Sequence, residues 1–285
     1  MSKPVAVDTH HHFWRYVKGR DAWLDNREDF AQLRRDFLAP EFEAHLRASG
    51  VDRTVIVQAA NTVEDTESMV ATAKQFPFIA GIVGWLPLDD PKATEARLNL
   101  YADEPLIKGV RHLILIDPDP NWQVRPGVIE SMGLLAERGY TWDSNAGTVA
   151  HLEQVVMLAE RYPHLKQVID HLGKPTIAAG LEQPWTSLMA RIATYPNVFV
   201  KISGIGHVTS ITDGGRVAFQ PFVDHILERF GPQRVMLGSN WPVAELFGNF
   251  EQTWSTTLAL LNGCSPIDRA QILGQSASRF YGLGL

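Results

Sequence analysis

Histidines cluster directly after the first apolar segment of the chain. The segment is Val5–Asp8, and it is followed by His10, His11 and His12. Because side chains of an extended strand alternate between its faces, His10 and His12 are expected to point one way and His11 the other. Two imidazoles on one face can bind a metal ion or hold a substrate oxygen. An affinity tag is also made of histidines, but it is longer and does not follow a strand directly.

Charged side chains stand near the ends of later apolar segments. Arg111 lies near the end of the fourth segment. Its planar guanidinium suits the binding of a substrate carboxylate or a polarised carbonyl. The alternative is a purely structural ion pair between Arg111 and a neighbouring acidic residue. His171 ends the sixth segment and is expected to face the site, so alternation turns Asp170 toward the helices in a structural role. Lys201 lies among apolar strand residues, which requires either a polar site or a structural ion pair.

Further candidate site residues also lie near the ends of apolar segments. Asp143 and Asn240 end the fifth and eighth segments. Tryptophans near segment ends are expected to form flat walls on which a ring stacks, with simple packing as the alternative; they are Trp14, Trp85, Trp142 and Trp241. The segment Phe13–Arg35 mixes aromatic and charged residues and is expected to cover the site. Within that covering segment, the side chains expected to influence substrate choice are Arg15, Tyr16 and Arg20.

Eight β-rich segments, each followed by an amphipathic one, must position these residues. The expected strands are Val5–Asp8, Thr54–Ala59, Ile79–Trp85, Ile107–Leu113, Tyr140–Asp143, Lys166–His171, Val198–Ser203 and Val235–Asn240. The expected helices are Pro40–Ser49, Glu64–Gln75, Lys92–Tyr101, Pro126–Glu137, Thr148–Arg161, Trp185–Thr194, Phe219–Arg229 and Phe250–Leu261. This order predicts a single α/β domain over residues 1–285, a TIM-type (β/α)₈ barrel with its site at the C-terminal ends of the strands.

Composition narrows the class of protein. The chain has 285 residues, 45% of them hydrophobic and 20% charged, as in ordinary globular proteins. The net charge of −6 argues against a nucleic-acid partner. No signal peptide or membrane-spanning run is evident, so we expect a cytoplasmic protein without a membrane partner. The single cysteine, Cys264, excludes an internal disulfide, and with no Gly-x-Ser-x-Gly motif nucleophilic catalysis by Ser or Cys finds little support.

Nine sequence blocks together resemble one protein family. They are Asp8–Trp14, Arg35–Leu38, Gly50–Asp52, Val57–Ala59, Gly109–His112, Asp170–Pro175, Lys201–Gly204, Gly238–Val243 and Ala277–Leu283. Each block alone is weak, but their number and order are specific. The chain resembles the amidohydrolase superfamily, in the branch of sugar-lactone and 2-pyrone-4,6-dicarboxylate lactonases. The resemblance covers almost the whole chain.

The resemblance implies a distorted (β/α)₈ barrel that hydrolyses a small-molecule lactone, the cyclic ester of a sugar acid or pyrone carboxylate. It implies that His10, His12 and His171 polarise the carbonyl and that Arg111 holds a substrate oxygen or carboxylate. Some members use these histidines to hold a divalent metal, whereas certain lactonases work without one. We expect no required cofactor, with one zinc ion on the three histidines as the alternative. Whether copies of the chain associate stays open.

Asn240 departs from the pattern that the resemblance implies. The family usually has an aspartate there, which deprotonates the attacking water. A neutral amide has no useful basicity near pH 7 and is a weaker metal ligand than a carboxylate. Three explanations stay open: an engineered substitution, a working hydrolase whose base is Asp143 or a histidine, and a protein that binds its ligand without turnover. Asn240 can orient water or a substrate hydroxyl in each case.

A second enzymatic interpretation is a zinc-dependent decarboxylase of an aromatic or pyrone acid, because the superfamily includes such enzymes. Asn240 counts against it, since that reaction needs a firm metal site. The third interpretation, a binding protein without catalysis, differs from both in its lack of turnover. Lactone hydrolysis is the prediction that these residues favour.

Overall fold

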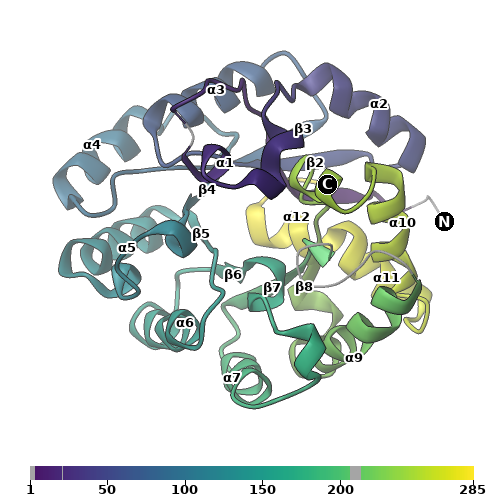
Figure 1. Ribbon diagram of the computed structural model, residues 1–285. Coiled ribbons are helices and arrows are strands. Elements are labelled where there is room, and N and C mark those ends of the chain that lie inside the picture. Colours follow the sequence, from purple (N-terminus) through teal and green to yellow (C-terminus); the bar gives the residue numbers. More distant parts are fainter. Residues whose placement is uncertain (1–3, 21, 206–212) are drawn as a thin grey trace.

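Eight parallel strands form a nearly closed barrel, and the helices surround it in chain order (Figure 1). The computed structural model describes residues 4–20, 22–205 and 213–285. The strands are β1 Val7–His11, β2 Arg53–Val57, β3 Ile79–Gly84, β4 Ile107–His112, β5 Thr141–Ser144, β6 Gln167–Ile169, β7 Val198–Ile202 and β8 Val235–Leu237. Backbone bonds of 2.7 Å from His12 N to Trp241 O and from Asn240 N to His10 O link the last strand to the first. The predicted TIM-type barrel is confirmed.

The helices begin and end at local signals in the sequence. Those between the strands are α2 Ala39–Ser49, α3 Val63–Ala73, α4 Pro91–Leu100, α5 Pro126–Arg138, α6 Val149–Arg161, α7 Trp185–Ile192 and α9 Asp213–Phe230, and α10 Phe250–Ala259 follows β8. The side chains of Thr62, Asp90 and Thr148 accept hydrogen bonds from the first turns of α3, α4 and α6. Gly50 and Gly139 end α2 and α5 in the left-handed conformation. All eight predicted helices are present.

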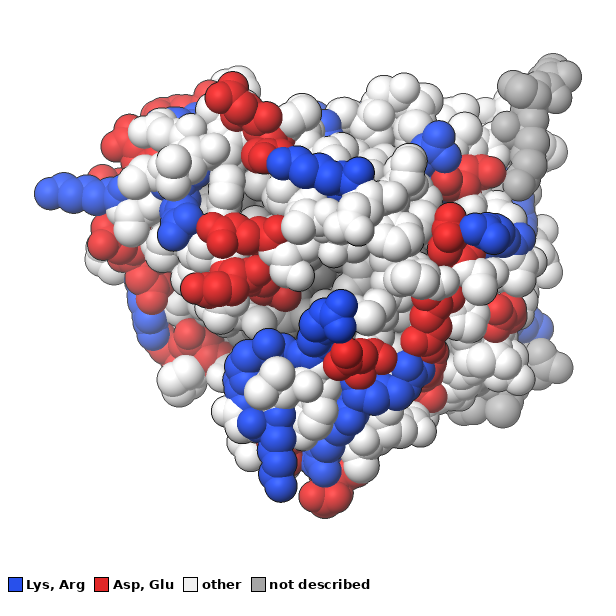
Figure 2. Space-filling model, turned by 90° about the horizontal axis from the view of Figure 1, so that it is seen from above, with Lys and Arg blue, Asp and Glu red and all other residues white. Residues whose placement is uncertain are grey.

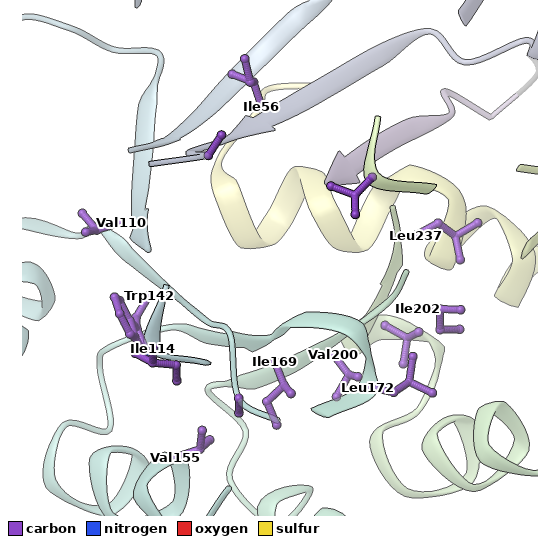
Figure 3. Packing of buried hydrophobic residues seen from close by; sticks show 14 of the residues in the cluster. Ile56, Val110, Ile114, Trp142, Val155, Ile169, Leu172, Val200, Ile202 and Leu237 are labelled. Atoms are coloured by element: carbon purple, nitrogen blue, oxygen red, sulfur yellow. The ribbon is translucent and has the colours of Figure 1, made fainter. Parts of the chain in front are cut away.

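Strand side chains alternate between two apolar clusters. The outer cluster fills the layer between strands and helices, where Figure 3 shows Ile169, Val200 and Val155 among its members. The inner cluster contains Val55, Val57, Val83, Val168 and Met236, which lie inside the barrel. This alternation decides which polar residues of each strand face the interior.

A C-terminal helix closes the end of the barrel opposite the predicted site. This helix, α12 Ser276–Tyr281, packs Ala277, Phe280 and Tyr281 into the inner cluster (Figure 1). Lys166 Nζ donates to the carbonyls of Arg279 and Phe280 at its last turn, at 3.1 and 3.2 Å. The sequence prediction missed this helix and the short helices α1 Ala22–Asp25 and α11 Pro266–Ala270. The C-terminal helix therefore fills this end of the barrel interior.

Two features of the described residues concern the partners expected from the sequence. No described helix is both long enough and apolar enough to span a bilayer. Acidic and basic side chains are intermingled on the face shown in Figure 2.

Candidate active site

A cavity of about 520 Å³ lies where the loops after the strands converge. Its lining comes from the end of β4, from the loops after β1, β2, β4, β5, β6 and β8, and from α1 and the segment between α1 and α2. The lining residues are His12, Trp23, Asn26, Arg27, Phe30, Ala59, Arg111, Leu113, Leu115, Ile116, Asn145, His171, Lys174, Asn240 and Val243. Among these described residues there are two arginines and a lysine but no carboxylate. The cavity therefore favours an electron-rich or anionic ligand.

The histidines at the end of β1 divide between the two faces of the strand, as alternation predicts. The ring of His10 lies 5.0 Å from that of His12 and 4.5 Å from that of His171. His11 points outward, with its ring 4.4 Å from Phe42. His12 and His171 line the cavity, whereas His10 is fully buried and does not. The structure thus brings the three histidines together but exposes only two of them to a ligand.

His12 and Asn240 form a hydrogen-bonded pair on the cavity wall. His12 Nδ1 lies 2.8 Å from the carbonyl of Val57, which can only accept, so Nδ1 carries the proton. The side chain of Asn240 is also hydrogen-bonded to His12, a contact that favours the protonated ring. Burial, followed by the nearby Arg111, lowers the pKa of His12 to about 3. His12 is therefore a neutral, weakly basic imidazole at physiological pH.

A left-handed turn after β6 aims His171 and Lys174 at the cavity. The φ angles are 53° at His171, 54° at Leu172, 68° at Gly173 and 50° at Lys174. Left-handed geometry costs about 1–2 kcal/mol for each non-glycine residue, so tertiary contacts must hold the turn. Leu172 is fully buried, and its carbonyl accepts a hydrogen bond of 2.9 Å from Trp185. Strained backbone of this kind is characteristic of functional sites.

Close backbone packing fixes two of the rings. A Cβ on Gly204, which has a φ of 62°, would lie 2.8 Å from His171 Nδ1, and one on Gly238 would lie 2.5 Å from His10 Cβ. His171 Nδ1 is also 2.8 Å from the hydroxyl of Ser203. Larger residues at either glycine would displace the imidazoles.

Asp170 faces the barrel interior, contrary to the prediction that it points toward the helices. The strand ends at Ile169, so continued alternation after inward Val168 places Asp170 inward, and the left-handed turn directs His171 independently. Asp170 lies 3.2 Å from His10 Nδ1, with Arg111 and Lys201 at the same distance. Burial alone raises the pKa of Asp170, but Lys201, His10 and Arg111 hold it well below its usual range. Asp170 is an ionised anchor.

Arg111 connects this anchor to the cavity. Its Nη1 donates to His10 Nε2 at 3.2 Å, which leaves the proton of His10 on Nδ1, facing Asp170. Its Nη2 donates to the carbonyl of Gln58 at 2.6 Å. Its Nε is buried without a hydrogen-bond partner among the described residues. Arg111 is thus held rigidly with a donor unused.

Lys201 and Asp143 lie below the cavity in a closed network. Lys201 Nζ is 2.6 Å from Asp143 Oδ2, and Tyr281 of α12 donates its hydroxyl to the same oxygen at 2.7 Å. Both members of the Lys201–Asp143 pair are fully buried, and neither lines the cavity. Burial raises the pKa of Asp143, which the Lys201 charge offsets in part. The structure does not bring Asp143, the base considered from the sequence, to the cavity wall.

One buried group offers the ligands of a metal ion. His10, Asp170 and His171 each present one ligand atom, all within 4.8 Å of one another, so the group could hold a metal. As arranged, however, both Asp170 oxygens contact protein cations at 3.2 Å, and His10 Nε2 accepts from Arg111. Asp170 Oδ1 nevertheless accepts no hydrogen bond from the described residues. The group could therefore hold a divalent ion, in competition with Arg111 and Lys201 for Asp170.

Three of the four predicted tryptophans lie in the apolar layers. Trp142 points outward and stacks on Trp122 with ring centroids 6.2 Å apart. Trp241 stacks on Phe42 at 4.7 Å, and Trp14 packs against Phe37 at 5.3 Å. None of them lines the cavity. Strand alternation alone identifies Trp142 as an outward residue, because its neighbour Asp143 faces inward.

Trp85 lies outside the cavity, whereas the covering segment lines part of it. Trp85 donates its indole N–H to His112 Nδ1 at 3.0 Å, outside the lining. The covering segment does contribute to the cavity, but through Trp23, Asn26, Arg27 and Phe30. These four replace the side chains named from the sequence: Arg15 and Arg20 line a different groove, and Tyr16 bonds to Asp25. Sequence reasoning also missed Asn145 and Lys174, although both follow strand ends.

Known proteins resemble the chain along its whole length. The family model described as Amidohydrolase matches residues 7–283. An L-fucono-1,5-lactonase of Burkholderia ambifaria is 32% identical over 96% of this chain and 94% of its own. Another L-fucono-1,5-lactonase, from Burkholderia multivorans, is 26% identical over 98% of this chain and 96% of its own.

A solved structure agrees with the fold. It is an amidohydrolase from Burkholderia multivorans with bound zinc, with a TM-score of 0.88 and 24% identity, over 98% of this chain and 99% of that one. This likeness supports the barrel alone. The family match over nearly all residues confirms the resemblance predicted from the sequence blocks. The chain belongs to the amidohydrolase family.

Proposed function

We propose that the chain hydrolyses the lactone of a six-carbon sugar acid, with a 1,5-lactone such as L-fucono-1,5-lactone as the first candidate. The observation that carries this proposal is the cavity, whose described lining joins rigid donors to three cationic side chains and has no carboxylate. Lactone opening converts a neutral ring into a carboxylate, and such a lining stabilises that developing charge. The names of the two Burkholderia relatives support a sugar lactone.

Polar groups without partners fit the hydroxyls of a sugar ring. Asn145 Oδ1 is buried and accepts no hydrogen bond from the described residues. Arg111 Nε is an unused donor in the same lining. Buried polar atoms normally have partners, so both are available to a ligand. Leu113, Leu115 and Ile116 add an apolar side against which carbon atoms of the ring can pack.

Arg111 and Asn240 are the donors we assign to the carbonyl oxygen. The Asn240 amide has two N–H groups that can donate. Such donors are worth about 3–4 kcal/mol each when they are aimed at the oxyanion. Asp170 and Gln58 hold Arg111 in place, so no reorganisation is needed as charge develops. We propose that hydrolysis needs no metal, because Arg111 and Lys201 already balance the charge of Asp170.

A lactone panel tests the proposed function. Proton release is recorded with a pH indicator for L-fucono-1,5-lactone, L-rhamnono-1,4-lactone and 2-pyrone-4,6-dicarboxylate, with spontaneous hydrolysis subtracted. We expect the 1,5-lactone to give the highest kcat/KM and dialysis against a chelator to leave it unchanged. A preference for the pyrone, or activity that returns only with zinc, would contradict the substrate class or the metal-free chemistry respectively. No catalysis with any member would refute the function.

A further inference from the structure

Few groups on the cavity wall can accept a proton from water. The described lining contains no carboxylate, and arginine stays protonated in proteins. Asn240 is an amide, and Asp143 is enclosed by Lys201 and Tyr281 below the wall. The remaining candidates are His12, His171 and Lys174.

The two histidines are held in other hydrogen bonds. His12 has one ring nitrogen on the Val57 carbonyl and bonds to Asn240, and its low pKa makes it a poor base. His171 Nδ1 bonds to Ser203, and its ring lies against the backbone of Gly204. Both rings are placed to touch a substrate; His12 is poorly suited to accept a proton, and one of the two ring nitrogens of His171 is already engaged.

Lys174 is positioned by the left-handed turn. Residues three apart in one tight helical turn lie on the same side, so His171 and Lys174 face the cavity together. Within residues 4–20, 22–205 and 213–285, Lys174 Nζ makes no hydrogen bond or ion pair. A half-buried lysine without a carboxylate partner is unusual, because burial penalises its charge.

The surroundings favour the neutral amine. Burial, with added repulsion from Arg111 and Arg27 and an opposing attraction from Asp170, lowers the pKa of Lys174 to about 8. A general base works best when its pKa lies near the working pH. Lys174 meets this condition, whereas His12 falls far below it.

From this placement we propose that Lys174 Nζ is the general base that deprotonates the attacking water. This inference rests on the proposed lactone hydrolysis. Neutral Nζ takes a proton from water while the water oxygen bonds to the carbonyl carbon, and the carbonyl π pair moves to the oxygen held by Arg111 and Asn240. The intermediate collapses, the ring C–O bond breaks, and the leaving alkoxide takes the proton from the Lys174 ammonium. The product acid releases its proton to solvent, so Lys174 ends neutral.

The pH profile and two variants test this role. For the wild type, kcat/KM with L-fucono-1,5-lactone is expected to rise with pH and level off above about pH 8. Lys174→Ala and Lys174→Arg are both expected to lose about 10²–10⁴-fold in kcat/KM, the usual range for a general base. Added alkylamines are expected to restore part of the activity of Lys174→Ala. Lys92→Ala, on the exposed side of α4, is the matched control and should match the wild type.

The arginine variant separates a base from a fixed charge. If Lys174 only attracted the product carboxylate, Lys174→Arg would keep most of the activity and the wild-type profile would fall above pH 8. Either result, or an alanine variant within threefold of the wild type, would overturn the inference while leaving the proposed function intact. A wild type without lactonase activity would refute both. The failures are therefore distinguishable.

Discussion

The two lysines of the site lie in opposite electrostatic settings. Lys201 is fully buried, with Asp143 at 2.6 Å and Asp170 at 3.2 Å. Lys174 lines the cavity and, in the described part of the chain, has no ion pair, while Arg111 and Arg27 add to its positive surroundings. The paired charges below the cavity fix geometry, whereas the amine of Lys174 on its wall is available to a ligand. We therefore assign a structural role to Lys201 and a role in the reaction to Lys174.

The largest expected effect comes from removing the paired lysine. Lys201→Met leaves Asp143 and Asp170 buried without their shared cation, which costs about 3–5 kcal/mol for a broken buried pair. Urea denaturation measures the free energy of unfolding. Lys166→Met, which removes a lysine bonded only to helix-end carbonyls, is the control and should cost less. Equal costs would show that the Lys201 network is not a special source of stability.

Removing the unpaired lysine is expected to act in the opposite direction. The folded pKa of Lys174, about 8, lies below its ordinary value of 10.5, so folding disfavours its charge at neutral pH. Between these values the unfolded chain binds more protons, so this contribution makes stability rise with pH. Lys174→Met should raise the free energy of unfolding at pH 7 by about 1–3 kcal/mol and reduce that rise. A destabilised variant would indicate that Lys174 has a partner of structural importance.

A carboxylate introduced into the cavity wall would pair with the cations there, as Asp143 and Asp170 pair with Lys201 below the cavity. Asn240→Asp introduces an anion next to His12 and into a lining that contains Arg111 and Lys174. We expect the pKa of His12 to rise from about 3, because the new carboxylate needs a donor from its ring. Inhibition by the sugar-acid product should weaken about tenfold, or about 1.4 kcal/mol. Product inhibition constants measure this, and tighter binding would contradict the role assigned to the carboxylate-free wall.

The barrel could be predicted from the sequence because strand and helix periodicities repeat eight times and each unit supports the next. Polar residues on regular strands were also accessible to that logic, as the opposite directions of His10 and His11 show. Alternation fails where the chain leaves the strand. Asp170 was assigned to the wrong face because the left-handed turn that places His171 has no period of two.

The features that the sequence did not predict are contacts between segments that are distant along the chain. Trp23 and Arg27 reach the cavity from a segment between β1 and α2 whose path no local pattern specifies. The pairing of Lys201 with Asp143 joins strands that are not neighbours, across the barrel interior. Tyr281 reaches the same carboxylate from the last helix, 138 residues away along the chain. Such contacts depend on how the barrel closes rather than on any local spacing.

The smallest expected effect tests whether the network below the cavity acts on stability alone. Tyr281→Phe keeps the ring but removes its hydrogen bond to Asp143 Oδ2, while Asp143 Oδ1 already has no partner among the described residues. A hydrogen bond to a charged group contributes about 1.5–3 kcal/mol, and Lys201 retains its contact with Asp143, so we expect a loss near the lower end of that range. Because Tyr281 is separated from the cavity by Asp143 and Lys201, kcat/KM should stay within about twofold. Tyr140→Phe, whose hydroxyl makes no hydrogen bond to the described residues, is the matched control. A large fall in kcat/KM with unchanged stability would mean that the network also tunes the chemistry, and the separation between the two lysines would no longer hold.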